Sequence, residues 1–225
     1  MTTPPTYSPV PHRTRLILRW IGDGGLASRP QLTRRFWPHA RYPRAAYQYL
    51  HDLIRQGHLL TARQTVLGRV YDLYVLTEQG RTAINVHPPF VRTGWPHHRE
   101  YTHLLLGQEV RLHLEQQLAR AGQGGQILAW RTDYLLRHLL PPAQTPQEIA
   151  DVQVELRRTA TSAVEVLHIE IDGDYYGTLL EAKAAAYGTQ QLPVLWACLP
   201  HRTTRIRKAV AAYPNIDVLA LELPD

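Results

Sequence analysis

The stretch from residue 28 to residue 80 constrains the fold of this chain most, because helix and strand patterns follow one another there at short intervals. Ser28 suits a helix N-cap, since its hydroxyl can accept a hydrogen bond from a backbone N–H of the first turn. Pro30 falls within that turn, where the N–H that proline lacks would have no partner. We therefore expect a short helix that begins at Ser28, continues to Phe36 and is broken by residues 37–40.

A second helix is expected from Pro43 to Gln56, ended by Gly57. On a wheel of 3.6 residues per turn, its two sides differ in character. The apolar side consists of Ala46, Tyr49, Leu50, Leu53 and Ile54. The polar and cationic side consists of Arg44, Tyr47, Gln48, His51 and Arg55. Such a helix can pack on a core with one side and offer hydrogen-bonding cations with the other.

Two β-like runs follow at residues 58–66 and 69–76, joined by a turn at Leu67-Gly68, and Thr77 can then cap a closing helix. Helix, turn, helix and hairpin is the order of a winged helix-turn-helix. Residues 53–60 (Leu-Ile-Arg-Gln-Gly-His-Leu-Leu) and 74–80 (Tyr-Val-Leu-Thr-Glu-Gln-Gly) resemble phrases common in winged-helix DNA-binding proteins.

A winged helix predicts how DNA would be bound, because a rigid helix fits the major groove and a basic hairpin can lie on the flanking backbone. Residues facing base edges would be Arg44, Gln48 and His51, with Tyr47 on the same side. Residues holding phosphates would be Arg34, Arg35, Arg55, Arg63 and Arg69. The alternative is a winged helix that only contacts proteins.

The charge distribution favours a polyanionic partner for the first half of the chain. The 225 residues carry a formal charge of +6, but residues 1–95 hold 13 arginines and 4 acids, whereas residues 96–225 hold 12 lysines and arginines and 15 acids. The single cysteine, Cys198, excludes an internal disulfide framework. With no apolar run of membrane-spanning length and no secretory signal pattern, we expect a cytoplasmic protein without membrane contacts.

The first 12 residues are rich in threonine and proline and are expected to form a disordered arm. The winged-helix domain would follow at 13–86, opening with a helix that buries Leu16, Ile17 and Trp20 and ends before Gly22. Residues 87–97 contain prolines and glycine without periodicity and are expected to link it to a second domain at 98–225.

The second domain alternates helix and strand signals, which predicts a mixed sheet and an α+β (α/β) protein. A long helix is expected from residue 98 to about 121. Strands are expected at 126–130, 151–157, 163–171, 192–199 and 216–223, with helices at 175–187 and 203–213. The resulting αβββαβ core has the element order of the restriction-endonuclease-like fold.

That resemblance reaches particular residues of the PD-(D/E)xK pattern. Asp151 opens the second strand as the first carboxylate would, with Ala150 in place of the usual proline, and Glu170 stands where the second would. Asp172 stands where the motif has lysine, while Lys183 lies on the next helix, as in some relatives of that fold. The resemblance implies catalytic roles for Asp151, Glu170 and Lys183, with Mg²⁺ or Mn²⁺ held by Asp151, Glu170 and Asp172. Alternatively, these acids belong to solvated turns.

Both halves together resemble the replication-relaxation family of plasmids and other mobile elements, over nearly the whole chain from residue 13. The similar segments are 103–110 (His-Leu-Leu-Leu-Gly-Gln-Glu-Val), 130–133 (Trp-Arg-Thr-Asp), 149–152 (Ile-Ala-Asp-Val) and 168–172 (His-Ile-Glu-Ile-Asp), followed by Lys183 and Tyr187. Gln108 and Asp133 depart from the family's preferred Asn and Glu. The resemblance implies DNA binding in plasmid replication, mobilisation or copy control.

Three hypotheses follow. In the first, the protein binds double-stranded DNA without a cofactor, controls replication, mobilisation or transcription, and uses its second domain for homodimerisation. In the second, it is a metal-dependent nuclease or nickase that needs Mg²⁺ or Mn²⁺. In the third, it is a non-enzymatic adaptor for replication or conjugation proteins. The basic run at residues 201–208 is either a second DNA contact or a solvated helix face.

Overall fold

A computed structural model describes residues 10–40, 44–84, 91–121, 124–139, 149–159, 161–173 and 175–224. The chain divides into two compact units, one of residues 1–64 and 70–95 and the other of residues 65–69 and 96–225. Most of the expected N-terminal arm and of the loop between residues 139 and 149 lies outside the described residues. As expected, the fold combines helices with two separate sheets.

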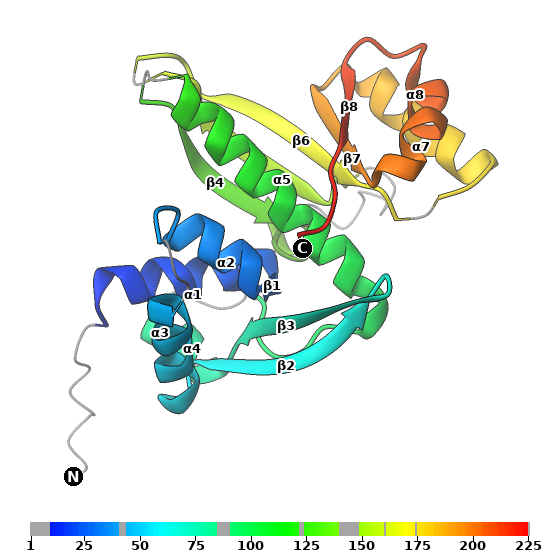
Figure 1. The fold of residues 1–225 in the computed structure, drawn as a ribbon. Helices are drawn as coiled ribbons and strands as arrows, with labels where there is room; N and C mark the ends of the chain where they lie inside the picture. The colour runs from blue at the N-terminus through cyan, green and yellow to red at the C-terminus, as the bar shows by residue number, and fades with distance from the viewer. Residues whose placement is uncertain are drawn as a thin grey trace. The chain divides into compact units, whose positions relative to one another are not determined.

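The first unit contains helices and a small sheet (Figure 1). Its elements are α1 (His12–Gly24), β1 (Ala27–Ser28), α2 (Arg29–Phe36), α3 (Arg44–Arg55), β2 (Leu59–Val66), β3 (Arg69–Leu76) and α4 (Glu78–Ala83). The sheet order is β1-β3-β2, with β1 antiparallel to β3. Strands β2 and β3 are joined at Leu67 and Gly68, whose φ angles of 50° and 78° match a tight hairpin turn.

Local interactions explain where these elements begin. Ser28 forms a capping box with Gln31: the Ser28 hydroxyl accepts from the Gln31 N–H, and the Gln31 side chain accepts from the Ser28 N–H at 2.9 Å. The Thr77 hydroxyl accepts from the Gly80 N–H at 2.8 Å and donates to the Gly57 carbonyl at 2.6 Å. A Cβ at Gly80 would overlap the His58 carbonyl oxygen. The Thr-x-x-Gly phrase therefore locks the end of the hairpin to the end of α3.

Helix α1 differs from the expectation in its end and its core face. The helix continues through Gly22 to Gly24, so the predicted end before Gly22 is wrong. Gly22 serves close packing, since a Cβ there would lie 2.8 Å from Leu76 Cδ2 and 3.0 Å from Val91 Cβ. Leu16 is also not a core residue, because 47% of it is exposed; Leu18 and Ile21 are buried with Ile17 and Trp20.

Part of the stretch expected as a linker is bonded to the first unit. Val91 is buried, the Arg92 N–H donates to the Gly22 carbonyl at 3.1 Å, and the Gly94 N–H donates to the Leu76 carbonyl at 2.8 Å. These bonds tie residues 91–94 to α1 and β3, although the sequence there lacks helix or strand periodicity.

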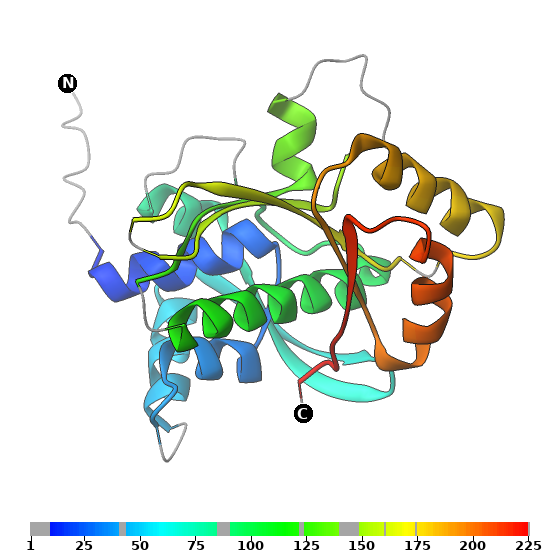
Figure 2. The same ribbon diagram turned by 90° about the horizontal axis from the view of Figure 1, so that it is seen from above.

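The second unit is built on a five-stranded sheet with helices on both faces (Figure 2). Its elements are α5 (Tyr101–Arg120), β4 (Gln126–Thr132), α6 (Asp133–Leu139), β5 (Val152–Arg157), β6 (Glu165–Ile171), α7 (Thr178–Gln190), β7 (Val194–Cys198), α8 (Thr203–Val210) and β8 (Ile216–Ala220). Short 3₁₀ helices at His98–Glu100 and Pro200–Arg202 precede α5 and α8. The strand order is β4-β5-β6-β7-β8, antiparallel from β4 to β6 and parallel from β6 to β8.

The αβββαβ order predicted for this unit is present, with one further helix. Helix α6 was not expected, because a helix of seven residues is too short to show a clear 3.6-residue period. Helix α5 lies along one face of the sheet, whereas α7 and α8 cover the other (Figure 2). On that second face, Trp196 is fully buried among Leu180, Tyr187, Ile206 and other apolar residues.

Within the described ranges, no helix combines the length and the apolar character that crossing a bilayer requires.

Two helical glycines of the second unit predict opposite effects of the same substitution. A Cβ at Gly188 in α7 would overlap the Tyr213 ring, whereas the nearest atom to a Cβ at Gly107 in α5 is Ile171 Cδ1 at 4.0 Å. We expect Gly188→Ala to lower the free energy of unfolding by about 1–3 kcal/mol through overpacking. Gly107→Ala should raise it by about 0.5–1 kcal/mol through helix propensity.

Denaturant unfolding of both variants beside the unchanged protein measures the two effects. Equal changes in the unfolding free energies of the two variants would show that a Cβ at position 188 does not collide with the Tyr213 ring.

Candidate functional site

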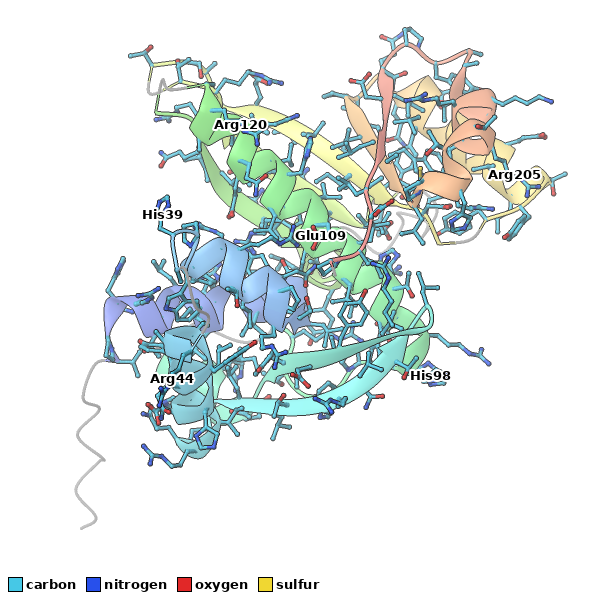
Figure 3. All side chains as sticks on the ribbon, in the orientation of Figure 1. His39, Arg44, His98, Glu109, Arg120 and Arg205 are labelled. Atoms are coloured by element: carbon cyan, nitrogen blue, oxygen red, sulfur yellow. The ribbon has the colours of Figure 1, made fainter. Side chains whose placement is uncertain are left out.

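The exposed side of α3 carries the residues predicted to read DNA. Ala46, Leu50 and Leu53 of this helix are buried. The polar and cationic side is exposed and consists of Arg44, Tyr47, Gln48, His51 and Arg55. Figure 3 labels Arg44 at the start of the helix. The predicted division of α3 into a core side and a solvent side is confirmed.

Asp52 organises part of this surface, which the sequence analysis did not anticipate. The Arg55 guanidinium donates to Asp52 Oδ1 at 3.0 Å, and the Gln48 amide donates to the same oxygen at 3.3 Å. The spacing of four residues between Gln48 and Asp52 was the available signal, since such pairs face each other on a helix. Asp52 restricts the orientation of two residues predicted to contact DNA.

A second acid, Asp72 on β3, gathers cations from two other elements. Arg63 of β2 pairs with Asp72 Oδ1 at 3.3 Å, and Arg29 of α2 pairs with Asp72 Oδ2. The Arg29 guanidinium also lies 4.5 Å from the centre of the Tyr47 ring. Tyr47 is thereby connected with Arg63 through Arg29 and Asp72, neither of which was predicted from the sequence.

The remaining predicted phosphate contacts are exposed as well. Arg34 and Arg35 lie in the last turn of α2, and Arg69 opens β3 directly after the hairpin turn. All nine residues predicted to contact DNA are therefore at the surface of the described chain. Their contact with DNA stays a prediction.

The second unit brings together Asp151, Glu170 and Lys183. Pairing of Val152 with Ile169 places the start of β5 beside the end of β6, and the Ile171 N–H donates to Asp151 Oδ2 at 2.7 Å. The Lys183 ammonium pairs with Glu170 Oε1. Glu170 is fully buried and Lys183 is 9% exposed.

Helix α7 supplies two partners to Glu170 because Lys183 and Tyr187 are four residues apart. The Tyr187 hydroxyl donates to Glu170 Oε2 at 2.7 Å, while its ring packs edge-on against Trp196 at 6.2 Å. The Lys183 ammonium also donates to the Tyr175 hydroxyl at 3.0 Å. The Glu170 carboxylate is thus held by one cation and one hydroxyl within the apolar layer between α7 and the sheet.

The charges of this group are coupled, and burial and the Asp151 carboxylate raise the pKa of Glu170 well above its ordinary value although Lys183 and the Tyr187 hydroxyl act in the opposite direction. Burial lowers the pKa of Lys183, but the carboxylates of Glu170 and Asp151 outweigh it and raise the pKa above its ordinary value. Burial raises the pKa of Asp151, but His103, Lys183 and the Ile171 N–H outweigh it and lower the pKa. Lys183 is therefore protonated and Asp151 ionised at neutral pH.

His103 on α5 is a partner that the sequence analysis gave no role, although it opens one of the segments similar to the replication-relaxation family. Its Nε2 lies 3.5 Å from Asp151 Oδ1. Burial lowers the pKa of His103, but the Asp151 carboxylate more than compensates and raises it. Asp151 is therefore held between a backbone N–H and an imidazole.

Asp172, the third predicted metal ligand, is engaged elsewhere. Arg202 donates to its two carboxylate oxygens at 2.7 and 3.3 Å, and to the Tyr175 carbonyl at 2.6 Å. In the described parts of the chain, no group of three or more His, Cys, Asp or Glu side chains is arranged to hold a metal ion. Of the three predicted ligands, Asp151 and Glu170 remain, and carboxylate oxygens such as theirs suit Mg²⁺ or Mn²⁺.

A cavity of about 290 Å³ opens at this group between α6 and α7. It is lined by Arg137, Ile149, Asp151, Tyr175, Leu179, Ala182 and Lys183. Asp151 and Lys183 can therefore meet a bound molecule, whereas the Glu170 side chain lies behind them in the interior.

One family model matches the chain, and its description is replication-relaxation. The match covers residues 18–187, from α1 to Tyr187, and so includes the α3 surface and the Asp151, Glu170 and Lys183 group. No curated protein matches the chain, and no solved structure does.

The buried pair predicts a strong coupling between two substitutions. Lys183→Met leaves the Glu170 carboxylate without its cation, so we expect it to lower the free energy of unfolding by about 3–5 kcal/mol. Adding Glu170→Gln removes the unpaired charge and should restore more than half of that loss. Denaturant unfolding of the single and double variants measures the coupling.

Lys208→Met is the matched control, because Lys208 is the other lysine of the chain and is exposed. It should change the unfolding free energy by no more than about 0.5 kcal/mol. If the double variant is as unstable as Lys183→Met, the cost comes from lost lysine packing and not from the buried charge.

Proposed function

Because this chain belongs to the replication-relaxation family, we propose that it is a DNA-binding protein of a plasmid or other mobile element, which controls replication, mobilisation or transcription. The family description indicates a role in replication or relaxation. The finer proposal is that the first unit acts as a winged helix on double-stranded DNA, without a cofactor.

The observation that carries this proposal is the exposed side of α3, where Arg44, Gln48 and His51 stand together on a helix anchored by its apolar side. In the major groove, Arg44 would donate to guanine and Gln48 would bond adenine edges. Arg34, Arg35, Arg55, Arg63 and Arg69 would hold phosphates and set the orientation of the helix. The 13 arginines and 4 acids of residues 1–95 supply the attraction.

We further propose that the protein acts as a homodimer assembled through its second unit. A two-fold dimer suits a palindromic site with half-sites about one helical turn, roughly 10 base pairs, apart. Analytical ultracentrifugation at micromolar concentration, with and without a two-site duplex, tests this. A monomer under both conditions would contradict it.

Two classes of substitution should separate base contacts from phosphate contacts. Arg44→Ala and Gln48→Ala should each reduce discrimination between the selected site and a scrambled duplex by about 1–3 kcal/mol. Arg63→Ala should weaken both duplexes equally, because phosphates carry no sequence information. The measurement is the ratio of the two dissociation constants, on a site selected from random duplexes.

Arg15→Ala is the control, since Arg15 is an exposed arginine of α1 outside the proposed contact set. An unchanged ratio for both α3 variants would contradict base reading by this helix. If the unchanged protein has no DNA affinity at moderate salt and captures a replication or conjugation protein, the adaptor hypothesis is favoured.

A metal-dependent nuclease or nickase is the second candidate function, favoured by the pairing of Lys183 with Glu170 and by the cavity that Asp151 and Lys183 line. Asp151 lines the cavity and would hold a Mg²⁺ or Mn²⁺ ion, with Glu170 as a second ligand from the interior behind it; the ion would supply an activated water for phosphodiester hydrolysis. The Ile171 N–H and the Tyr187 hydroxyl orient the two carboxylates. Lys183, which faces the cavity, would neutralise charge on the attacked phosphate.

Incubation with supercoiled plasmid and Mn²⁺ tests this second function. Nicked or linear product that disappears with Asp151→Asn is the expected result for a nuclease, because Asn keeps an acceptor for the Ile171 N–H but lacks the charge. Glu181→Gln is the control, since Glu181 is exposed on the same helix as Lys183. No product, with DNA binding intact, would leave the second unit without nuclease chemistry.

A further inference from the structure

Helix α8 concentrates positive charge in a part of the chain that is otherwise acidic. Between Glu181 and Asp217 there is no acidic residue, and the segment from 202 to 208 contains three arginines and one lysine. The surrounding residues 96–225 hold more acids than lysines and arginines. A local cluster of this kind attracts anions even where the net charge is negative.

The helix is oriented so that most of these charges face solvent. Ile206 and Val210 are buried in the apolar core beneath α7 and the sheet. Arg205, Arg207 and Lys208 fall on the remaining sides of the helix and are exposed. Figure 3 labels Arg205 on the outer surface of α8. Because Ile206 and Val210 face the core, α8 presents these three cations to solvent.

Tyr176 fixes the position of one of them. Its ring lies 4.5 Å from the guanidinium carbon of Arg205 and 4.4 Å from that of Arg202. Tyr176 is 55% exposed, whereas Arg202 is buried and bonded to Asp172. Arg202 thus anchors the tyrosine, and the tyrosine supports an exposed arginine, which loses less freedom on binding than an unsupported one.

This cluster lies at the same end of the sheet as the Asp151, Glu170 and Lys183 group. Strands β6 and β7 are parallel, so the C-terminal end of β6 at Glu170 and the chain that leads from β7 into α8 are at the same end of the sheet. Tyr175 also connects them: its hydroxyl accepts from Lys183, and its carbonyl accepts from Arg202. The α8 cluster and the cavity are therefore at the same end of the sheet.

We propose that the exposed face of α8, with Arg205 supported by Tyr176, contacts the phosphate backbone of DNA beside the Asp151, Glu170 and Lys183 group. Arginine and lysine on a helix that itself carries no acid suit phosphates, and no group that reads bases is needed. The inference rests on the proposed function in taking DNA as the partner. It adds a contact on the second unit that does not depend on the DNA sequence, and the cations of α8 lie outside the residues matched by the family model.

The salt dependence of DNA binding by the full chain tests the proposal. Each lost phosphate contact should make the slope of log K against log salt concentration shallower by about 0.9. We expect this for Arg205→Ala and about twice this change for Arg205→Ala with Lys208→Ala, on a duplex of random sequence. Arg120→Ala is the control, because Arg120 is exposed at the opposite end of the second unit (Figure 3).

Substitutions of Tyr176 test whether the ring positions Arg205. Tyr176→Ala should weaken binding several-fold with unchanged thermal stability, because the side chain is more than half exposed. Tyr176→Phe keeps the ring and should restore the original affinity. Equal affinities of all three proteins would overturn this role of Tyr176.

The outcome for α8 is separable from that for α3. Loss of sequence discrimination in Arg44→Ala with an unchanged slope for Arg205→Ala would overturn the α8 contact and leave the proposed function in place. A shallower slope for Arg205→Ala without any sequence preference would retain the α8 contact and overturn base reading by α3. A slope for Arg205→Ala equal to that for Arg120→Ala overturns the proposal in either case.

Discussion

The second unit depends on the buried ion pair between Lys183 and Glu170. A carboxylate in an apolar layer is costly unless a cation and hydrogen bonds compensate it, and here Lys183 and Tyr187 provide both from one helix. This requirement sets the rotation and the position of α7 against β6. The residues that stabilise the unit are thus the ones proposed for metal-dependent chemistry. A substitution there would change the stability together with any such activity.

In the first unit, packing and the proposed DNA contacts use different residues. Its frame is held by contacts away from the exposed side of α3, such as the Ser28 capping box and the Thr77 bonds to Gly57 and Gly80. Close packing at Gly22 against Leu76 and Val91 adds to this frame. The solvent side of α3 takes no part in these contacts, so substitutions there should leave the fold intact.

The accuracy of sequence-based prediction differed between elements for physical reasons. Helix α3 and the hairpin were predicted well because their periods and end residues are local properties. The end of α1 was missed because Gly22 meets Leu76 and Val91, which are distant in sequence. Strand β1 has two residues and α6 has seven, so neither produces a period that a window can detect.

The sequence by itself determined the order of elements, the amphipathic division of α3 and the concentration of arginine in residues 1–95, since these depend on neighbours within a few residues. It also named Asp151, Glu170 and Lys183. Only the tertiary structure decided the partners of these acids: His103 lies beside Asp151, Tyr187 donates to Glu170, and Arg202 pairs with Asp172. Those pairings join residues 17 to 48 positions apart, and the packing of helices on the sheet selects among the many that composition allows.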